Sequence, residues 1–286
     1  MYNFPIGVLL DCFKTDIDTA IKKAVSVGAQ GIQIYATSGE LAPDNLTGAK
    51  RAEFLDKVNS AGLTIAALCG DLGHGFGDPA KNPELIEKSK RILELAKELG
   101  TNVVTTHIGV VPGDPSHERY KIMQQACNTL SEFANNLGGY FAIETGPETS
   151  AVLKTFLDSL AVKGVGVNMD PANLIMVTGD DPVQAVHTLK DYIVHTHAKD
   201  GVKNYDKDPE IIYGLKQHSV EEEIAKGDAF AEVPLGQGGV DFPNYLRALE
   251  QIAYTGFLTI EREVGDNPEA DIELAVEFLR GIIGKA

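Results

Sequence analysis

The sequence predicts an α/β protein that folds as a (β/α)8 TIM barrel, with residues 1–286 as a single domain. Eight runs of strand length recur, and seven are almost continuously apolar or β-branched, which is typical of strands buried on both faces of a parallel sheet. Amphipathic segments with helix-capping residues lie between these runs. Strands that alternate with helices in this way favour a barrel, and a doubly wound open sheet is the alternative.

The elements follow one another regularly along most of the chain. Helices are marked by Asp or Asn before the first turn, by Pro at the first helical position and by Gly after the last turn. The predicted strands cover 6–10, 31–35, 64–68, 102–107, 140–144, 164–169, 192–197 and 257–261. The helix signals bound segments at 17–27, 47–61, 83–99 and 152–160, and they start further helices near 181–182, 241–243 and 267–269.

One interval is too long for a single helix, because 60 positions separate His197 from Phe257. Residues 201–239 are mostly polar, so we expect an extended loop after the seventh strand, above the face where barrel active sites lie. This loop either acts as a lid or a subunit contact, or is a solvent-exposed segment without a functional role. Within it, the glycine-rich turn 236–239 precedes a helix start, so its amides either cradle a phosphate or only turn the chain.

Composition narrows the class of protein. The chain is 43% hydrophobic, enough for a full core, and has no apolar run long enough to cross a membrane. It begins without a basic leader, and Cys12, Cys69 and Cys127 form no CxxC pair, so we expect a reduced, cytoplasmic protein. The net charge of −16 repels a phosphate backbone and therefore opposes a nucleic-acid partner.

Five successive predicted strands end on a residue that can bind a metal ion or move a proton: His107, Glu144, Asp170, His197 and Glu261. In a parallel barrel these ends meet at one edge, where active sites lie. Carboxylates and imidazoles gathered there would repel one another or shift their pKa values, unless a divalent cation accepts them. The mainly oxygen donor set suits Mn²⁺, Mg²⁺ or Co²⁺, with Zn²⁺ as a further option.

The same residues also have purely structural interpretations. Paired with Lys199 or Arg262, the two glutamates would be buried ion-pair partners. Asp170 would cap the turn that begins at Pro171, and His107 would be a core histidine with satisfied hydrogen bonds. The order of five such residues at one edge favours the functional interpretation over these alternatives.

Several short motifs occur in a fixed order along the chain. They are AIETGPETS (142–150), VNMDPAN (167–173), HTHAKDG (195–201), PLGQGGVDF (234–242) and IERE (260–263). In this order and spacing they resemble the xylose-isomerase-like TIM-barrel superfamily, and the resemblance covers nearly the whole chain. That superfamily includes sugar phosphate isomerases and epimerases, ketose 3-epimerases, inosose dehydratases and DNA-repair enzymes of the AP-endonuclease type.

The resemblance implies a site with one divalent metal ion, for which Mn²⁺ is the first choice. Its implied ligands are Glu144, Asp170, His197 and Glu261. In the epimerase branch the two glutamates also act as the acid/base pair, and the metal stabilises the ene-diolate that forms when a proton leaves the carbon next to the carbonyl. From their positions near the predicted site, we expect substrate contacts at His107, Asn173, Lys199 and His74. The alternative for Lys199 is a solvated loop lysine.

Two positions depart from the family pattern. Asn173 stands where many members have a second histidine, which weakens the AP-endonuclease-like interpretation. Gln33 stands where relatives often have a glutamate, and an amide cannot act as a base. We therefore predict a metal-dependent isomerase or epimerase of a ketose or sugar phosphate, active in carbohydrate metabolism and forming a homo-oligomer. The alternatives are an inosose-type dehydratase, a DNA-repair enzyme and a sugar-binding barrel without catalysis.

Overall fold

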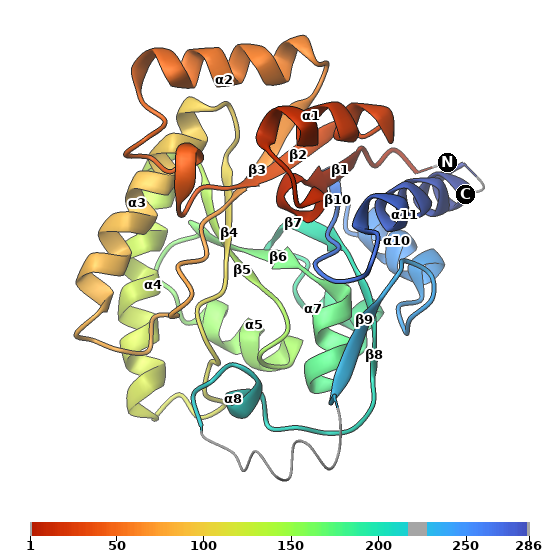
Figure 1. Cartoon of the computed structure of the whole chain (residues 1–286). Helices are drawn as coiled ribbons and strands as arrows, with labels where there is room; N and C mark the ends of the chain where they lie inside the picture. Colours follow the sequence, from red (N-terminus) through yellow and green to blue (C-terminus); the bar gives the residue numbers. More distant parts are fainter. Residues whose placement is uncertain (1, 217–227, 285–286) are drawn as a thin grey trace.

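The computed structural model describes residues 2–216 and 228–284 and contains a closed barrel of eight parallel strands (Figure 1). In chain order the strands are β1 (Ile6–Leu9), β2 (Gly31–Tyr35), β3 (Thr64–Cys69), β4 (Val103–Thr106), β5 (Tyr140–Glu144), β6 (Val165–Met169), β7 (Ile193–Ala198) and β10 (Leu258–Ile260). The barrel closes where β1 pairs with β10. The predicted barrel is confirmed, with each strand within one or two residues of its expected ends.

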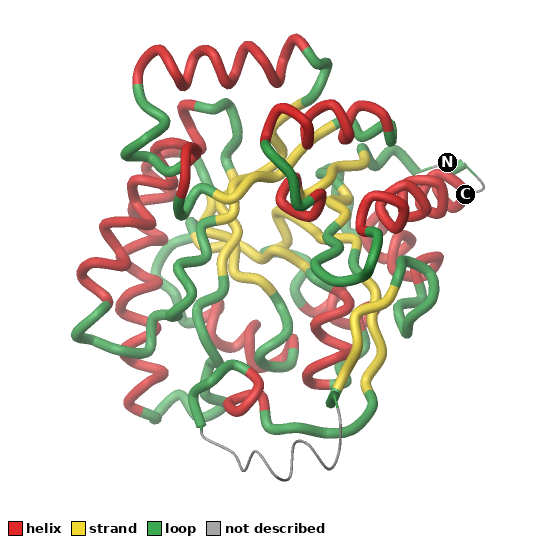
Figure 2. The backbone as a smooth tube through the Cα atoms, viewed as in Figure 1, coloured by secondary structure: helices red, strands yellow, loops and turns green. Residues whose placement is uncertain are grey.

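Helices surround this barrel, as the ring of red coils about the yellow strands shows in Figure 2. The long ones are α1 (Ile17–Ser26), α2 (Gly48–Ser60), α3 (Asn82–Glu98), α4 (Glu118–Leu137), α5 (Ser150–Asp158), α7 (Pro182–Thr188), α10 (Phe242–Gln251) and α11 (Pro268–Ile283). Capping follows the sequence signals: the side chains of Asp16, Asp181, Asp241 and Asn267 each accept a backbone N–H at the start of a helix. Short helical turns complete the fold at η1 (Leu10–Phe13), η2 (Gly39–Leu41), α6 (Pro171–Asn173), η3 (Leu174–Thr178) and α8 (Pro209–Ile212).

The apolar residues of the strands are buried between the barrel interior and the helix ring. Val8, Ile32, Val104, Phe141 and Val167 have at most a trace of exposed surface. Burial on both faces explains why these strands were visible in the sequence as continuous apolar runs. It also fixes the strands rigidly, so that the residues at their C-terminal ends are held in defined positions.

The segment after β7 is more ordered than the predicted loop. Here β8 (Asp200–Lys203) pairs with β9 (Phe230–Val233) in an antiparallel ribbon outside the barrel, and α8 lies between them in the chain. The charged stretch 219–228 falls, except for Asp228, outside the described residues. The prediction that this segment acts as a lid or subunit contact stays a prediction.

The glycine-rich turn 236–239 does not present its amides to a ligand. The buried Asp200 carboxylate accepts the backbone N–H groups of Gly201, Gly236, Gly238 and Val240, at 2.9 to 3.1 Å. The phosphate-cradle interpretation of this turn is therefore wrong, and the turn instead joins the ribbon to the barrel. A side chain at Gly238 would collide with Asp200, since its Cβ would lie 2.2 Å from Oδ1.

No helix among the described residues is both long and apolar enough to cross a membrane.

Candidate metal centre

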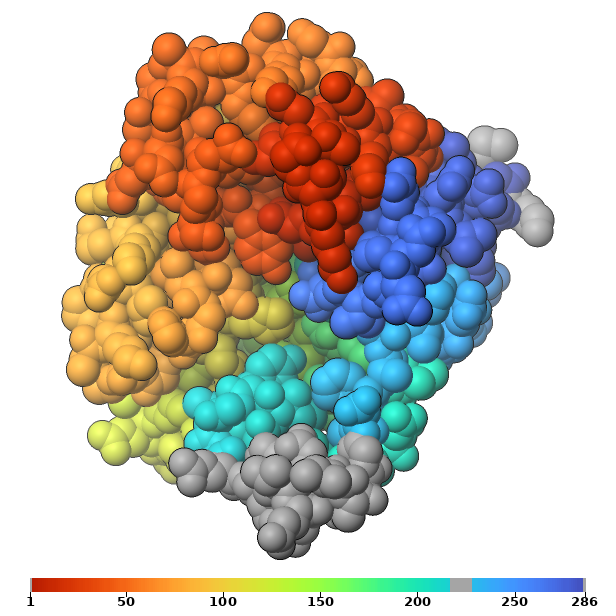
Figure 3. Space-filling view, in the orientation of Figure 1, coloured from red at the N-terminus to blue at the C-terminus, as the bar shows by residue number. Residues whose placement is uncertain are grey.

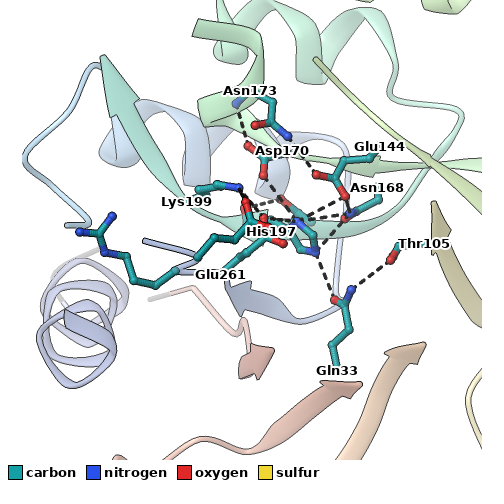
Figure 4. A network of polar contacts seen from close by, with 12 residues as sticks. Gln33, Thr105, Glu144, Asn168, Asp170, Asn173, His197, Lys199 and Glu261 are labelled. Atoms are coloured by element: carbon teal, nitrogen blue, oxygen red, sulfur yellow. Dashed lines mark hydrogen bonds and ion pairs between the residues drawn. The ribbon is translucent and has the colours of Figure 1, made fainter. Parts of the chain in front are cut away.

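The barrel brings four of the predicted residues together at its C-terminal edge (Figure 4). Glu144 ends β5, His197 lies near the end of β7, and Asp170 and Glu261 directly follow β6 and β10. All four are buried, and each offers one ligand atom within 4.8 Å of the others. Measured from Nδ1 of His197, carboxylate oxygens of Glu261, Asp170 and Glu144 lie at 3.3, 3.5 and 3.7 Å.

This group fits a divalent cation. Oδ1 of Asp170 accepts the backbone N–H of Asn173 at 2.9 Å, but Oδ2 is buried and accepts no hydrogen bond from the protein. A buried carboxylate oxygen without a donor is costly, and three carboxylates around one imidazole increase that cost. A 2+ ion would satisfy them together, and the oxygen-rich donor set suits Mn²⁺, Mg²⁺, Co²⁺ or Zn²⁺.

Gln33 orients the imidazole of His197. The Gln33 amide nitrogen donates to Thr105 Oγ1 at 3.0 Å, so Oε1 must point the other way, toward the histidines. Nε2 of His197 lies 3.2 Å from this oxygen and Nε2 of His195 lies 3.0 Å from it, so both nitrogens must carry the proton. Burial alone would lower the pKa of His197, but Glu261 and Glu144 raise it well above its usual range, so in the metal-free protein Nδ1, which faces the carboxylates, is protonated as well. A metal ion would displace that proton and bind the lone pair of Nδ1.

The hydrogen bonds to Glu144 come from neutral amides, and His107 and His197 each lie 3.7 Å from one of its oxygens. Asn168 donates to Oε2 at 3.0 Å and Asn173 donates to Oε1 at 2.9 Å. Burial raises the pKa of Glu144 to about 7, although His107 and His197 act in the opposite direction. Asn173, predicted as a substrate contact, therefore also holds a candidate ligand in place.

The surroundings of Glu261 are cationic. Lys199 donates to Oε2 of Glu261 at 2.9 Å and to Glu263 at 2.7 Å, and it lies 3.6 Å from Glu232. Burial alone would raise the pKa of Glu261, but Lys199 and His197 hold it well below its usual range. The sequence offered Lys199 and Arg262 as ion-pair partners of the glutamates. Lys199 pairs with Glu261, whereas Arg262 pairs with Glu232 and with an aspartate of α11.

A cavity of about 580 Å³ opens above these residues, within the size range of small-molecule sites. His107 lines it, with Nδ1 3.2 Å from Asp71 and its ring 5.9 Å from that of Tyr213, which follows α8. Burial alone would lower the pKa of His107, but Glu144 and Asp71 raise it to about 9. In Figure 3 the teal residues around α8 border the recessed centre of this face.

Sequence reasoning missed Asp71, Tyr213 and the buried Glu148, because each reaches the site region from a loop or turn without a strand-end signal. Burial raises the pKa of Glu148 to about 8, and only one of its oxygens accepts a hydrogen bond, from Val111. His74 is exposed on the turn after β3 and does not line the cavity, so its role as a substrate contact stays a prediction.

Comparison with known proteins agrees with this architecture. The model of the xylose isomerase-like TIM barrel family matches residues 21–282. The chain belongs to this family. The crystal structure of a xylose isomerase domain protein from Planctomyces limnophilus is similar over 99% of both chains, with 26% sequence identity and a TM-score of 0.78.

Two further solved structures share the fold at lower identity. One is the probable 3-DHS dehydratase AsbF from Bacillus anthracis, at 18% identity and a TM-score of 0.74, covering 96% of this chain and 98% of that one. The other is the 3-keto-D-glucoside 4-epimerase YcjR from E. coli, at 17% identity and a TM-score of 0.71, covering 98% of this chain and all of that one. At these identities the likeness shows the fold alone.

Proposed function

We propose that this protein is a divalent-metal-dependent isomerase or epimerase that acts on a ketose or a ketose phosphate. The observation that carries the proposal is the position of Glu144 and Glu261 in the buried four-residue group. Their strands, β5 and β10, are separated in the barrel by β6 and β7, so the two carboxylates reach the site from different sides. The proposal includes a cytoplasmic homo-oligomer with a small-molecule substrate and no nucleic-acid partner.

Glu144, Asp170, His197 and Glu261 would hold the metal. When bound, the ion supplies a Lewis acid that polarises the substrate carbonyl and stabilises negative charge on its oxygen. The chain's own carboxylates move the proton: one glutamate removes it from the carbon next to the carbonyl, and the other returns a proton on the opposite face. Acid/base catalysis of this kind contributes about 10²- to 10⁴-fold.

Hydrogen bonds from surrounding side chains fix the orientation of both glutamates for proton transfer. Lys199 fixes Oε2 of Glu261, and Asn168 and Asn173 fix the two oxygens of Glu144. Each carboxylate is therefore held in one orientation before a substrate arrives, which lowers the reorganisation needed during the reaction.

A dehydratase is the second candidate, supported by the likeness to AsbF, whose TM-score is close to that of the epimerase YcjR. The same base would remove the proton next to the carbonyl, and a hydroxyl would then leave with a proton from the other carboxyl group. The product would be lighter than the substrate by one water, so mass spectrometry separates the two candidates.

The test is proton exchange. The Mn²⁺-loaded protein is incubated in deuterated water with a panel of ketoses and ketose phosphates, and proton NMR follows the signals next to each carbonyl. We expect one signal to disappear with the wild-type protein and with Glu250→Gln, which changes an exposed residue of α10, but not with Glu261→Gln or Glu144→Gln. Absence of exchange with every substrate, in protein shown to hold metal, would refute the proposal.

A further inference from the structure

We propose that the substrate is an uncharged polyhydroxylated ketose, and that the cavity excludes phosphorylated and carboxylated sugars. This inference rests on the proposed function and specifies its substrate class. Three features of the described residues support it: the glycine-rich turn 236–239 binds a carboxylate of the chain itself, the lining cations Lys199 and His107 are paired with carboxylates, and the lining carries more carboxylates than cations.

The first feature is Asp200. Backbone amides that converge on one point form a natural site for a phosphate. Here the amides of Gly201, Gly236, Gly238 and Val240 all converge on the carboxylate of Asp200, which is 1% exposed. The chain supplies its own anion to this turn, so no donor there is free for a phosphate of the substrate.

The second feature is the pairing of the cationic side chains. Lys199 is 4% exposed, and its ammonium group donates to Glu261 and Glu263 and lies 3.6 Å from Glu232. His107 is bound to Asp71 through Nδ1, and its Nε2 lies 3.7 Å from Glu144. An anionic ligand would have to displace a carboxylate of the protein from either cation, and it gains little by that exchange.

The third feature is the charge of the lining. Among the described residues, the acidic groups that line the cavity are Asp71, Glu144, Asp228, Glu232, Glu261 and Glu263. With Asp170 included, these carboxylates still outnumber the positive charges of Lys199, a protonated His107, a bound 2+ ion and Arg262, which pairs with Glu232. The cavity therefore keeps a negative excess, which repels a phosphate or carboxylate group. Carboxylates are acceptors only, so they favour a ligand that presents many O–H donors, as a free sugar does.

Matched pairs test this inference. D-fructose is compared with D-fructose 6-phosphate, and D-ribulose with D-ribulose 5-phosphate, in the deuterium-exchange assay with Mn²⁺-loaded protein. We expect the free ketose of a reactive pair to exchange with at least tenfold higher kcat/KM than its phosphate. A phosphate that exchanges faster than its free ketose overturns the inference and leaves the proposed function intact.

A second measurement decides the inference even if no pair exchanges. The thermal midpoint of unfolding of the metal-free protein is measured with and without 10 mM inorganic phosphate, for the wild type and for Glu263→Gln. The Glu263 side chain is 52% exposed, so its replacement leaves the core unchanged while releasing one partner of Lys199. No increase in the midpoint, or an equal increase in both proteins, supports the inference, because phosphate then does not bind at Lys199. An increase in the wild type that is larger in Glu263→Gln places phosphate at Lys199 and overturns it.

Discussion

The two glutamates of the site are the same residue type, lie at the same edge of the barrel and are similarly buried, at 6% and 7% exposure, yet their environments are opposite. Glu144 is held by the amides of Asn168 and Asn173, and burial raises its pKa. Glu261 is held by Lys199, and its pKa is well below the usual range. Chemical roles in this site therefore depend on the partners that neighbouring strands supply, more than on the residue type at the strand end.

The largest expected effect on stability comes from removing the cation on the Glu261 side. Lys199→Met removes the ammonium group that pairs with the buried Glu261, whereas Glu232 keeps Arg262, so we expect the free energy of unfolding to fall by about 3–5 kcal/mol. Asn173→Ala, on the Glu144 side, removes one hydrogen bond and should cost only about 1–2 kcal/mol. Urea denaturation of the metal-free proteins measures both.

The double variant Lys199→Met/Glu261→Gln provides the control, because it also removes the charge left without a partner. It should regain part of the lost stability. If the lysine and asparagine variants lose equal stability, the contrast between the two sides is wrong.

The next largest effect is on metal affinity and comes from Asp170, the candidate ligand that lies between Glu144 and Glu261 in the chain. Asp170→Asn keeps an oxygen that can accept the N–H of Asn173, but it removes one negative charge from the four-residue group. Changes to residues outside a ligand set already cost about 10- to 100-fold in metal affinity, so we expect the dissociation constant for Mn²⁺ to rise by at least about 100-fold, with no loss of stability in the metal-free protein. Calorimetric titration with Mn²⁺ and urea denaturation test the two parts separately. Unchanged affinity would show that Asp170 serves only as a cap.

Gln33 is the positioning residue that distinguishes the two nitrogens of His197. Gln33→Met removes the acceptor of His197 Nε2–H, so we expect Mn²⁺ affinity to fall by about 10-fold or more. Gln33→Glu keeps an acceptor at this position and should preserve the hydrogen bond of Nε2–H. Proton NMR of the metal-free protein detects the hydrogen-bonded ring N–H signals of the histidines, and calorimetric titration measures the Mn²⁺ affinity. An unchanged Nε2–H signal and unchanged affinity in Gln33→Met would contradict this role.

The sequence allowed the strands and the five ionisable strand-end residues to be predicted, because both depend on local pattern, whereas the choice of four of them as ligands came from the family resemblance. Continuous apolar runs mark the strands, and an ionisable residue at the end of such a run stands out. The partners of those ligands depend on distant contacts. Gln33 of β2 meets His197 of β7 across the barrel interior, although these strands are not neighbours, and Glu232 reaches Lys199 from the ribbon.

The ribbon itself was missed for a related reason. Its strands, DGVK and FAEV, are short, partly polar and only partly buried, so neither has the apolar run that revealed the barrel strands. Their pairing also joins residues about thirty positions apart, which no local pattern specifies. Asp200 illustrates the consequence: its motif was noted, but only the folded turn shows that it binds four backbone amides.

The remaining effect is on the pH dependence of stability and concerns Glu148, a third buried glutamate, which has no cationic partner among its hydrogen bonds. Burial raises its pKa from 4.5 to about 8, so the folded protein binds a proton that the unfolded chain has released. Stability should therefore fall as the pH rises from about 4.5 to about 8, and become constant with respect to this group above that range. A shift of this size corresponds to a fall of about 5 kcal/mol across the whole range.

Glu148→Gln keeps an acceptor for Val111 but cannot titrate, so it should remove that part of the slope and be more stable than the wild type at pH 8. Urea denaturation at several pH values, with Glu250→Gln as the exposed control, measures the difference. If the two proteins keep parallel profiles, Glu148 is ionised when buried, and burial alone does not raise its pKa.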